Sequence, residues 1–169
     1  MLPARAVRLA ALLLLALPLA VQAGGDRIPM RQQNSHTYYV PVRMGDSLSG
    51  EFLVDTGSSH MVIRASTLRA LQKQGHARFV KNLTGHMADG RSKVVPIYRI
   101  DRIRVGKHCL IEGVEAAVFP DNARPILGLS ALRRAAPIQL SVDPPALRLS
   151  RCGSTTASRT GDEALARSE

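Results

Sequence analysis

Apolar and polar residues alternate along most of this chain in short runs, which is the period of β-strands. Helical spacing is confined to two short segments, 66–74 and 129–134. Turn residues such as Gly, Asp and Pro separate the runs. We therefore expect an all-β sandwich or closed barrel with one or two short helices. The expected strands are 37–44, 48–54, 60–63, a long hairpin over 78–100, 103–105, 109–119, 138–142 and 147–149.

The first 23 residues form a different pattern, which is typical of a secretory signal peptide. Arg5 and Arg8 precede a run of apolar residues, and 21–23 is a small-x-small cleavage pattern. The apolar run is short for a membrane span, which needs about 20 residues. Retention of the segment as an uncleaved anchor is the alternative, and only then would the chain associate with a membrane. Both readings predict an exported protein, either periplasmic or secreted.

The rest of the chain is expected to hold a single folded domain. Residues 24–35 are polar with little periodicity, which predicts a flexible leader. The apolar alternation then continues over 36–152, the expected domain. Residues 153–169 are rich in Ser, Thr, Ala and charged residues, which predicts a disordered tail.

The chain of 169 residues is basic, with 23 Lys and Arg against 13 Asp and Glu. A basic protein is often a nucleic-acid binder. Export argues against that partner, and aromatic residues, at 4%, are too few to provide stacking platforms beside the basic ones. The simplest interpretation is a solvated basic surface. An acidic substrate and an anionic membrane face are the alternatives.

Cysteine and histidine usage bears on metals and disulfides. Cys109 and Cys152 are an even pair in an oxidising compartment, where a disulfide is plausible. The sequence leaves open an internal bridge, a bridge between subunits and two free thiols. Two Cys cannot form a four-Cys zinc site, and no His pair has the spacing of a helical zinc site. We expect no metal and no cofactor.

The segment 52–59 carries the strongest chemical signal. Asp55 follows three apolar residues, Phe52-Leu53-Val54, at the end of an expected buried strand. A carboxylate in such a place costs several kcal/mol unless it is hydrogen-bonded or paired. Residues 56–59, Thr-Gly-Ser-Ser, supply hydroxyls and open backbone N–H groups that can donate to it. A plain turn that ends the strand, with Asp55 capping its own loop, is the alternative.

Residues 52–59 resemble the active-site loop of aspartic proteases, which has Asp-Thr/Ser-Gly after an apolar strand. Ile126-Leu127-Gly128 resembles the hydrophobic-hydrophobic-Gly element that closes that fold around the loop. The hairpin tipped at Asp89-Gly90 lies between the two, where the family has its flap. The resemblance covers roughly 37–150 and is closest to the single-domain, retropepsin-like proteases of bacteria. It implies a closed acid-protease barrel with a flap hairpin.

The resemblance also implies roles for individual residues. Asp55 would be the catalytic carboxylate, supported within its loop by Thr56, Gly57 and Ser58. The Ser58 hydroxyl would donate to the carboxylate and favour its ionised form, which predicts an acidic pH optimum. The flap tip would contact substrate, and a later segment would support the loop. These two groups are Ala88, Asp89, Gly90 and Arg91 for the flap, and Ile126, Leu127 and Gly128 for the support.

The chain contains a single Asp-Thr-Gly. The chemistry of this family needs two carboxylates that share one proton. An active enzyme would therefore be a symmetric homodimer in which each chain contributes Asp55. We expect an exported aspartic endopeptidase that acts on extended peptide or protein substrates. A catalytically inactive peptide-binding module of the same fold is the main alternative, and an unrelated β-domain with a chance Asp-Thr-Gly is the other.

Overall fold

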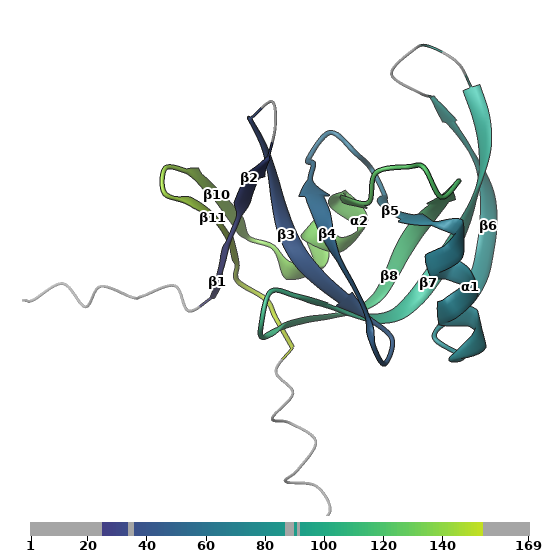
Figure 1. Ribbon diagram of the computed structural model, residues 1–169, viewed down its shortest axis with the longest axis horizontal. Helices are drawn as coiled ribbons and strands as arrows, with labels where there is room; N and C mark the ends of the chain where they lie inside the picture. Colours follow the sequence, from purple (N-terminus) through teal and green to yellow (C-terminus); the bar gives the residue numbers. More distant parts are fainter. Residues whose placement is uncertain (1–24, 34–35, 87–89, 91, 154–169) are drawn as a thin grey trace, which may run out of the picture.

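The computed structural model describes residues 25–33, 36–86, 90 and 92–153. Most of them lie in strands (Figure 1). The expected signal segment, 1–23, lies outside the described residues, as does the expected tail apart from Gly153. The elements in order are β1 (Asp26–Pro29), β2 (Arg31–Gln33), β3 (Thr37–Met44), β4 (Leu48–Val54), β5 (Met61–Arg64), α1 (Ala65–Lys73), β6 (Ala77–His86), β7 (Ser92–Val105), β8 (Cys109–Phe119), β9 (Ile126–Leu127), α2 (Leu129–Leu132), the 3-10 helix η2 (Arg133–Ala135), β10 (Ile138–Val142) and β11 (Pro145–Leu149).

The main sheet closes on itself. Its strand order is β2-β3-β4-β9-β5-β8-β7-β6, and an additional pairing between β3 and β7 joins the two sides of the row. That seam is short, running from Val42 opposite Val105 to Met44 opposite Ile103. The result is a ring of six strands, with β2 and β6 attached outside it, and not a regular barrel. The all-β prediction is confirmed.

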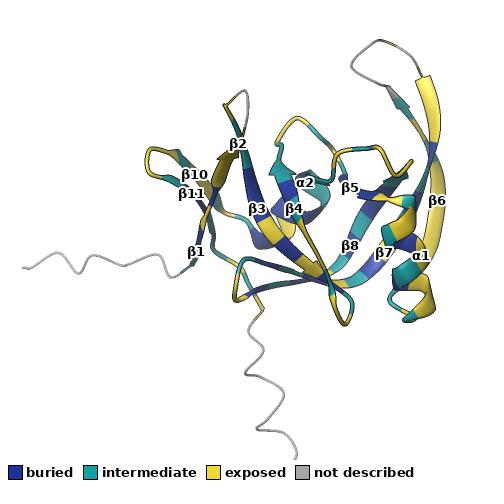
Figure 2. Cartoon of the chain, viewed as in Figure 1, coloured by how far each residue is buried: buried dark blue, intermediate teal, exposed yellow. Residues whose placement is uncertain are grey.

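The ring encloses one main hydrophobic core (Figure 2). Alternate residues of β3, β7 and β8 point inward, which explains the period-2 pattern of their sequences. The short helix α2 contributes Leu132, which is fully buried. The described residues include no buried polar or charged residue. Among them, no helix is both long and apolar enough to cross a membrane.

Residues 26–33, within the segment 24–35 where composition predicts a flexible leader, contain two strands. The first, β1, pairs with β11 and the second, β2, pairs with β3, both antiparallel. Only Ile28 and Met30 of this segment are buried apolar residues, so its sequence shows almost no alternation. The backbone hydrogen bonds that place it come from strands elsewhere in the chain, which local composition cannot reveal. The pair β1–β11 extends to β10 and forms a separate three-stranded sheet.

A disulfide joins Cys109 to Cys152, with Cα atoms 4.7 Å apart. Of the three alternatives that the sequence leaves open, the internal bridge is the one formed. Gly153 exchanges backbone hydrogen bonds with Leu110 beside it, at 3.0 and 3.2 Å. Together these bonds fasten the end of the described chain to β8.

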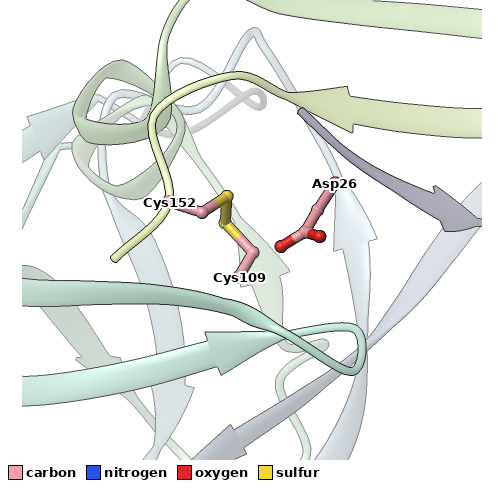
Figure 3. Close-up of side chains that lie close together, drawn as sticks. All are labelled: Asp26, Cys109 and Cys152. Carbon is pink, nitrogen blue, oxygen red and sulfur yellow. A yellow bond between two sulfur atoms is a disulfide. The ribbon is translucent and has the colours of Figure 1, made fainter. Parts of the chain in front are cut away.

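Asp26 lies beside the bridge (Figure 3). One oxygen of its carboxylate and the two sulfur atoms lie within 4.8 Å of one another. This grouping resembles a set of metal ligands. Because the two sulfurs are bonded to each other, however, neither is available as the thiolate that a metal ion would require.

Candidate active site

Asp55 stands where two distant segments of the chain meet. It directly follows β4, which pairs in parallel with the short strand β9 through Leu53–Ile126 and Val54–Leu127. The backbone N–H of Asp55 continues this ladder by donating to the carbonyl of Leu127 at 3.3 Å. The expected supporting segment therefore lies directly beside the Asp-Thr-Gly loop.

The carboxylate of Asp55 is held by its own loop. The Gly57 N–H donates to Oδ1 at 2.8 Å, and the Ser58 N–H donates to the Asp55 carbonyl at 3.4 Å. Asp55 is half-buried, whereas Thr56 and Gly57 are exposed. A side chain at position 57 would start 3.2 Å from Oδ1, so Gly leaves the carboxylate open.

The Ser58 hydroxyl does not bond the carboxylate as expected. It donates to the carbonyl of His60 at 2.8 Å. A hydroxyl has a single proton to donate, so that proton is used inside the turn. The acidic optimum that we inferred from a Ser58–Asp55 bond therefore receives no support from this structure.

Gly128 brings the supporting segment into close contact with the loop. A Cβ at this position would lie 2.3 Å from the carbonyl oxygen of His60 and 2.8 Å from that of Ser58. Because both neighbours are backbone atoms, only Gly fits. The close approach allows the Leu129 N–H to donate to the Ser58 carbonyl at 2.8 Å. It also allows the Ser130 N–H to donate to the Ser59 carbonyl at 3.0 Å.

Ser130 adds a second link between the loop region and β8. Its Oγ accepts the Met61 N–H at 2.8 Å and donates to the Glu115 carbonyl at 2.6 Å. The hydroxyl thus connects the start of β5 with β8, two strands that also pair in parallel. Its hydrogen-bonding position makes it part of the scaffold and not a nucleophile.

Asp55 opens onto a cleft of about 670 Å³ between its loop and the hairpin of β6 and β7. Asp55 is the sole acidic residue that lines the cleft within the described part of the chain. One wall is apolar and belongs to a small second cluster, whose members are Val62, Leu83, Val95, Ile97, Ala117, Phe119 and Ile126. Arg124 and His60 also line the cleft, and Arg124 is exposed.

Residues 40–131 match the family model described as Aspartyl protease, which is more than half of the chain. This chain belongs to the aspartyl protease family. Its fold resembles the crystal structure of a retropepsin-like aspartic protease from Rickettsia conorii, with a TM-score of 0.53 and 20% identity. That similarity covers 75% of this chain and 89% of the other. Comparison with curated protein sequences gives no match.

The chain is thus a member of the aspartyl protease family with a retropepsin-like fold. Of the residues expected in the site, Asp55, Gly57, Ser58 and Ile126 line the cleft. Leu127 and Gly128 are buried behind the loop, and Thr56 is exposed outside the cleft lining.

The hairpin of β6 and β7 projects beyond the other strands (Figure 1), and it contributes to the cleft lining, as expected for a flap. Gly90 at its tip has a φ of 81°, a conformation that favours Gly and that the Asp-Gly pair predicts. The other three flap residues, Ala88, Asp89 and Arg91, lie outside the described residues. From the hairpin, Leu83, Thr84 and Gly85 reach the cleft.

The cleft walls of the protease were not predicted from sequence. Val95 and Ile97 on β7 and Ala117 on β8 were recognised only as strand residues. The available signal was a second set of inward-facing apolar positions near the hairpin tip, separate from the main core. Arg124 lay in a segment expected to be only a loop, where one charged residue has no pattern to mark it.

Replacing Gly128 by Ala tests the contact between the two segments. We expect a loss of about 1–3 kcal/mol in the free energy of unfolding, because the new methyl group would displace the Ser58–His60 backbone. Chemical denaturation measures this loss. Gly50→Ala in β4 is the control, since a Cβ there would meet only the Phe52 side chain, at 3.6 Å. Equal losses in both variants would contradict the argument.

Asp121 holds the loop that carries Arg124 against α1. Its Oδ1 accepts the Ser66 N–H at 2.7 Å, and its Oδ2 accepts from Arg69 at 3.3 Å. The hydrogen bonds from Ser66, its backbone N–H first, and the Arg69 guanidinium hold the pKa of Asp121 below its ordinary value of 3.8. A lowered pKa stabilises the folded state above the ordinary value, and the effect disappears as the pH falls through the lowered one.

Asp121→Asn should therefore melt at a lower temperature than the wild type above pH 4, and the difference should close at more acidic pH. Melting curves of both proteins between pH 2 and 6 measure it. Asp143→Asn, in the exposed turn between β10 and β11, is the matched control. A difference that grew toward acidic pH would have the wrong sign.

Proposed function

We propose that this protein is an endopeptidase in which Asp55 is the catalytic carboxylate. The observation that carries the proposal is that Asp55 is the sole acidic residue on the cleft among the described residues. Gly57, which has no side chain, leaves the Asp55 carboxylate accessible and donates a hydrogen bond to it. The β4–β9 pairing positions the loop. In this proposal Thr56, Gly57 and Ser58 shape the loop, and Ile126, Leu127 and Gly128 support it. Ala88, Asp89, Gly90 and Arg91 would close over substrate.

We further propose that the active form is a symmetric homodimer. Peptide hydrolysis by carboxylates requires a base and an acid in one site. One chain supplies one Asp55, so a second chain would supply the other. Thr56 and Gly57, next to Asp55 in sequence, are both exposed, which supports contact between two such loops.

The proposed reaction needs the two carboxylates in opposite protonation states. The ionised Asp55 takes a proton from a water molecule, whose oxygen attacks the peptide carbonyl carbon. The protonated Asp55 of the partner donates its proton to the carbonyl oxygen, which gives a tetrahedral intermediate. Transfer of a proton to the amide nitrogen then breaks the C–N bond and releases the two products. Because the carboxylates are adjacent like charges, one of them retains a proton.

The cleft suggests how a substrate would bind. An extended peptide lying between the Asp55 loop and the hairpin of β6 and β7 would place alternate side chains in the cleft. The apolar wall of Val95, Ile97 and Ala117 favours an apolar side chain there. Arg124, which makes no hydrogen bond or ion pair within the described residues, would favour a neighbouring acidic side chain.

The edge strand β10 offers a surface for dimerisation. Leu140 and Val142 on it are 44% and 59% exposed. Leu140→Lys is expected to weaken the dimer at least about tenfold with little change in stability, because the position is already exposed. Light scattering against protein concentration measures the dimer. Gln139→Lys adds the same charge on the opposite face of the strand, and an equal effect there would exclude this face as the interface.

Export is also part of the proposal. Its support is the signal-peptide pattern of residues 1–23 and the Cys109–Cys152 disulfide, a bond that persists in oxidising compartments.

Cleavage of a diverse peptide library between pH 3 and 8, measured over a range of protein concentrations, tests the function. The proposal predicts internal cuts and a specific activity that rises with the dimer fraction. Cuts confined to peptide ends would reject the endopeptidase assignment. A folded dimer that bound peptides without cleaving them would instead establish the inactive peptide-binding module.

A further inference from the structure

A second recess lies at the other end of β4, where the chain turns from β3 into that strand. It has a volume of about 250 Å³ and is lined by residues of β3, β7 and the turn. Three of them are arginines, Arg43, Arg102 and Arg104, and two are serines, Ser47 and Ser49. Asp55 comes six positions after Ser49, which corresponds to about 20 Å along a strand. The recess is therefore separate from the proposed catalytic cleft.

The strand register forces the arginines together. Arg43 on β3 lies directly opposite Arg104 on β7, and on its other side it lies opposite Ser49 on β4. Arg102 is two residues from Arg104, so both side chains lie on the same face of β7. Like charges directly opposite each other on neighbouring strands destabilise a sheet. An anion bound between the arginines would offset this repulsion.

The guanidinium groups of these arginines carry N–H donors that have no acceptor among the described residues. The Nε of Arg104 is buried and has no hydrogen-bond partner. Within the described part of the chain, none of the three guanidinium groups forms a hydrogen bond or an ion pair. A guanidinium carries five N–H donors, and leaving a buried donor without an acceptor is unfavourable. An acceptor in the recess would therefore bond the terminal nitrogens of these groups, because the Nε of Arg104 is covered by protein atoms.

Among the described residues, three acidic ones lie in or beside the recess. Asp46 is the one acidic residue of its lining among those described, and its carboxylate lies 3.2 Å from the Nε2 of His76. Glu112 is paired with Arg102 in the β7–β8 register, but it is exposed. Glu51 lines the adjoining recess together with Arg43, Ser49 and Lys107, and its Oε2 is buried without a hydrogen-bond partner. Within the described part of the lining, three arginines face one carboxylate, that of Asp46, which already contacts His76.

We propose that this recess binds a phosphate group. A tetrahedral phosphate presents several acceptor oxygens, which suit the planar donor forks of Arg43 and Arg104 in bidentate contact. Arg102 adds a third positive charge, and the hydroxyls of Ser47 and Ser49 can donate to the remaining oxygens. The phosphate can be a free ion or the headgroup of a lipid, since both present the same oxygens to the arginines.

Calorimetric titration of the full chain with inorganic phosphate tests the site. Arg43→Gln and Arg104→Gln should each raise the dissociation constant at least about tenfold, as expected for loss of a charge-assisted contact. Arg133→Gln removes the same charge from an exposed position on η2, and it should leave the dissociation constant unchanged. Phosphate should also raise the melting temperature of the wild type but not that of the Arg104 variant. That second readout shows whether each variant is folded.

Sedimentation with vesicles distinguishes the two sources of phosphate. Binding to phosphatidic acid vesicles, but not to phosphatidylcholine vesicles, that is lost in the Arg43 and Arg104 variants would identify a lipid headgroup. Binding of free phosphate without vesicle binding would identify a soluble ligand. The proposal is overturned if inorganic phosphate neither binds nor stabilises the wild type. It is also overturned if Arg133→Gln weakens binding as much as the other variants, because net charge alone would then explain the effect.

Discussion

Replacing Asp55 by Asn should lower the rate of peptide cleavage by at least about 10³-fold. The substitution removes the charge that would activate water but keeps an oxygen that can accept the Gly57 N–H, so the loop should hold its shape. Steady-state cleavage of one library-derived peptide measures the loss. A matched control is Asp143→Asn, which changes an exposed carboxylate that does not line the cleft. Retention of wild-type activity by Asp55→Asn would reject the catalytic assignment.

Mixing the wild type with Asp55→Asn tests whether the two chains of a dimer share one site. If each site uses Asp55 from both chains, a mixed dimer is inactive, and activity should fall as the square of the wild-type fraction at constant total protein. If each chain works alone, activity should fall linearly. The shape of this curve separates the dimer proposal from the assignment of Asp55, because the two can fail independently.

Removal of the disulfide should have the largest effect on stability. The bridge closes a loop with a sequence separation of 43, for which the chain-entropy argument gives about 4 kcal/mol. Cys109→Ala/Cys152→Ala should lose most of that amount in the free energy of unfolding, measured by denaturant titration. Alanine avoids placing a hydroxyl at position 109, which is fully buried.

A reducing agent supplies the control for this experiment. Dithiothreitol should lower the stability of the wild type to that of the double variant and leave the variant unchanged. A wild type insensitive to reduction, or a double variant as stable as the oxidised protein, would show that the bridge does not constrain the unfolded chain.

Local patterns predicted most of the elements because these strands are half-buried. The alternation in β3, β7 and β8 reports which residues face the core, and the Asp-Gly pair predicts the hairpin turn at Gly90. The Asp55 loop and its supporting segment were found because each is a short continuous motif. Their contact then followed from the resemblance to a family of known fold.

Features that depend on pairing between distant segments were missed. β1 and β2 are held by β11 and β3, and their own sequences carry little signal. The Cys109–Cys152 bond was expected only as one of three alternatives, because it depends on a separation of Cα atoms that no spacing along the chain reveals. The arginines of the second recess were read as scattered surface charge, since only the register places Arg43 against Arg104. The Ser58 hydroxyl donates to the His60 carbonyl and not, as expected, to the Asp55 carboxylate.

The pairing of β4 with β9 also bears on when the enzyme can become active during its synthesis. The Asp-Thr-Gly loop lies in the first half of the chain, but its close partner Gly128 is made much later. A nascent chain that has emerged only as far as β8 carries the catalytic sequence without the backbone that positions it. The order of synthesis therefore delays assembly of the site until most of the domain has been made.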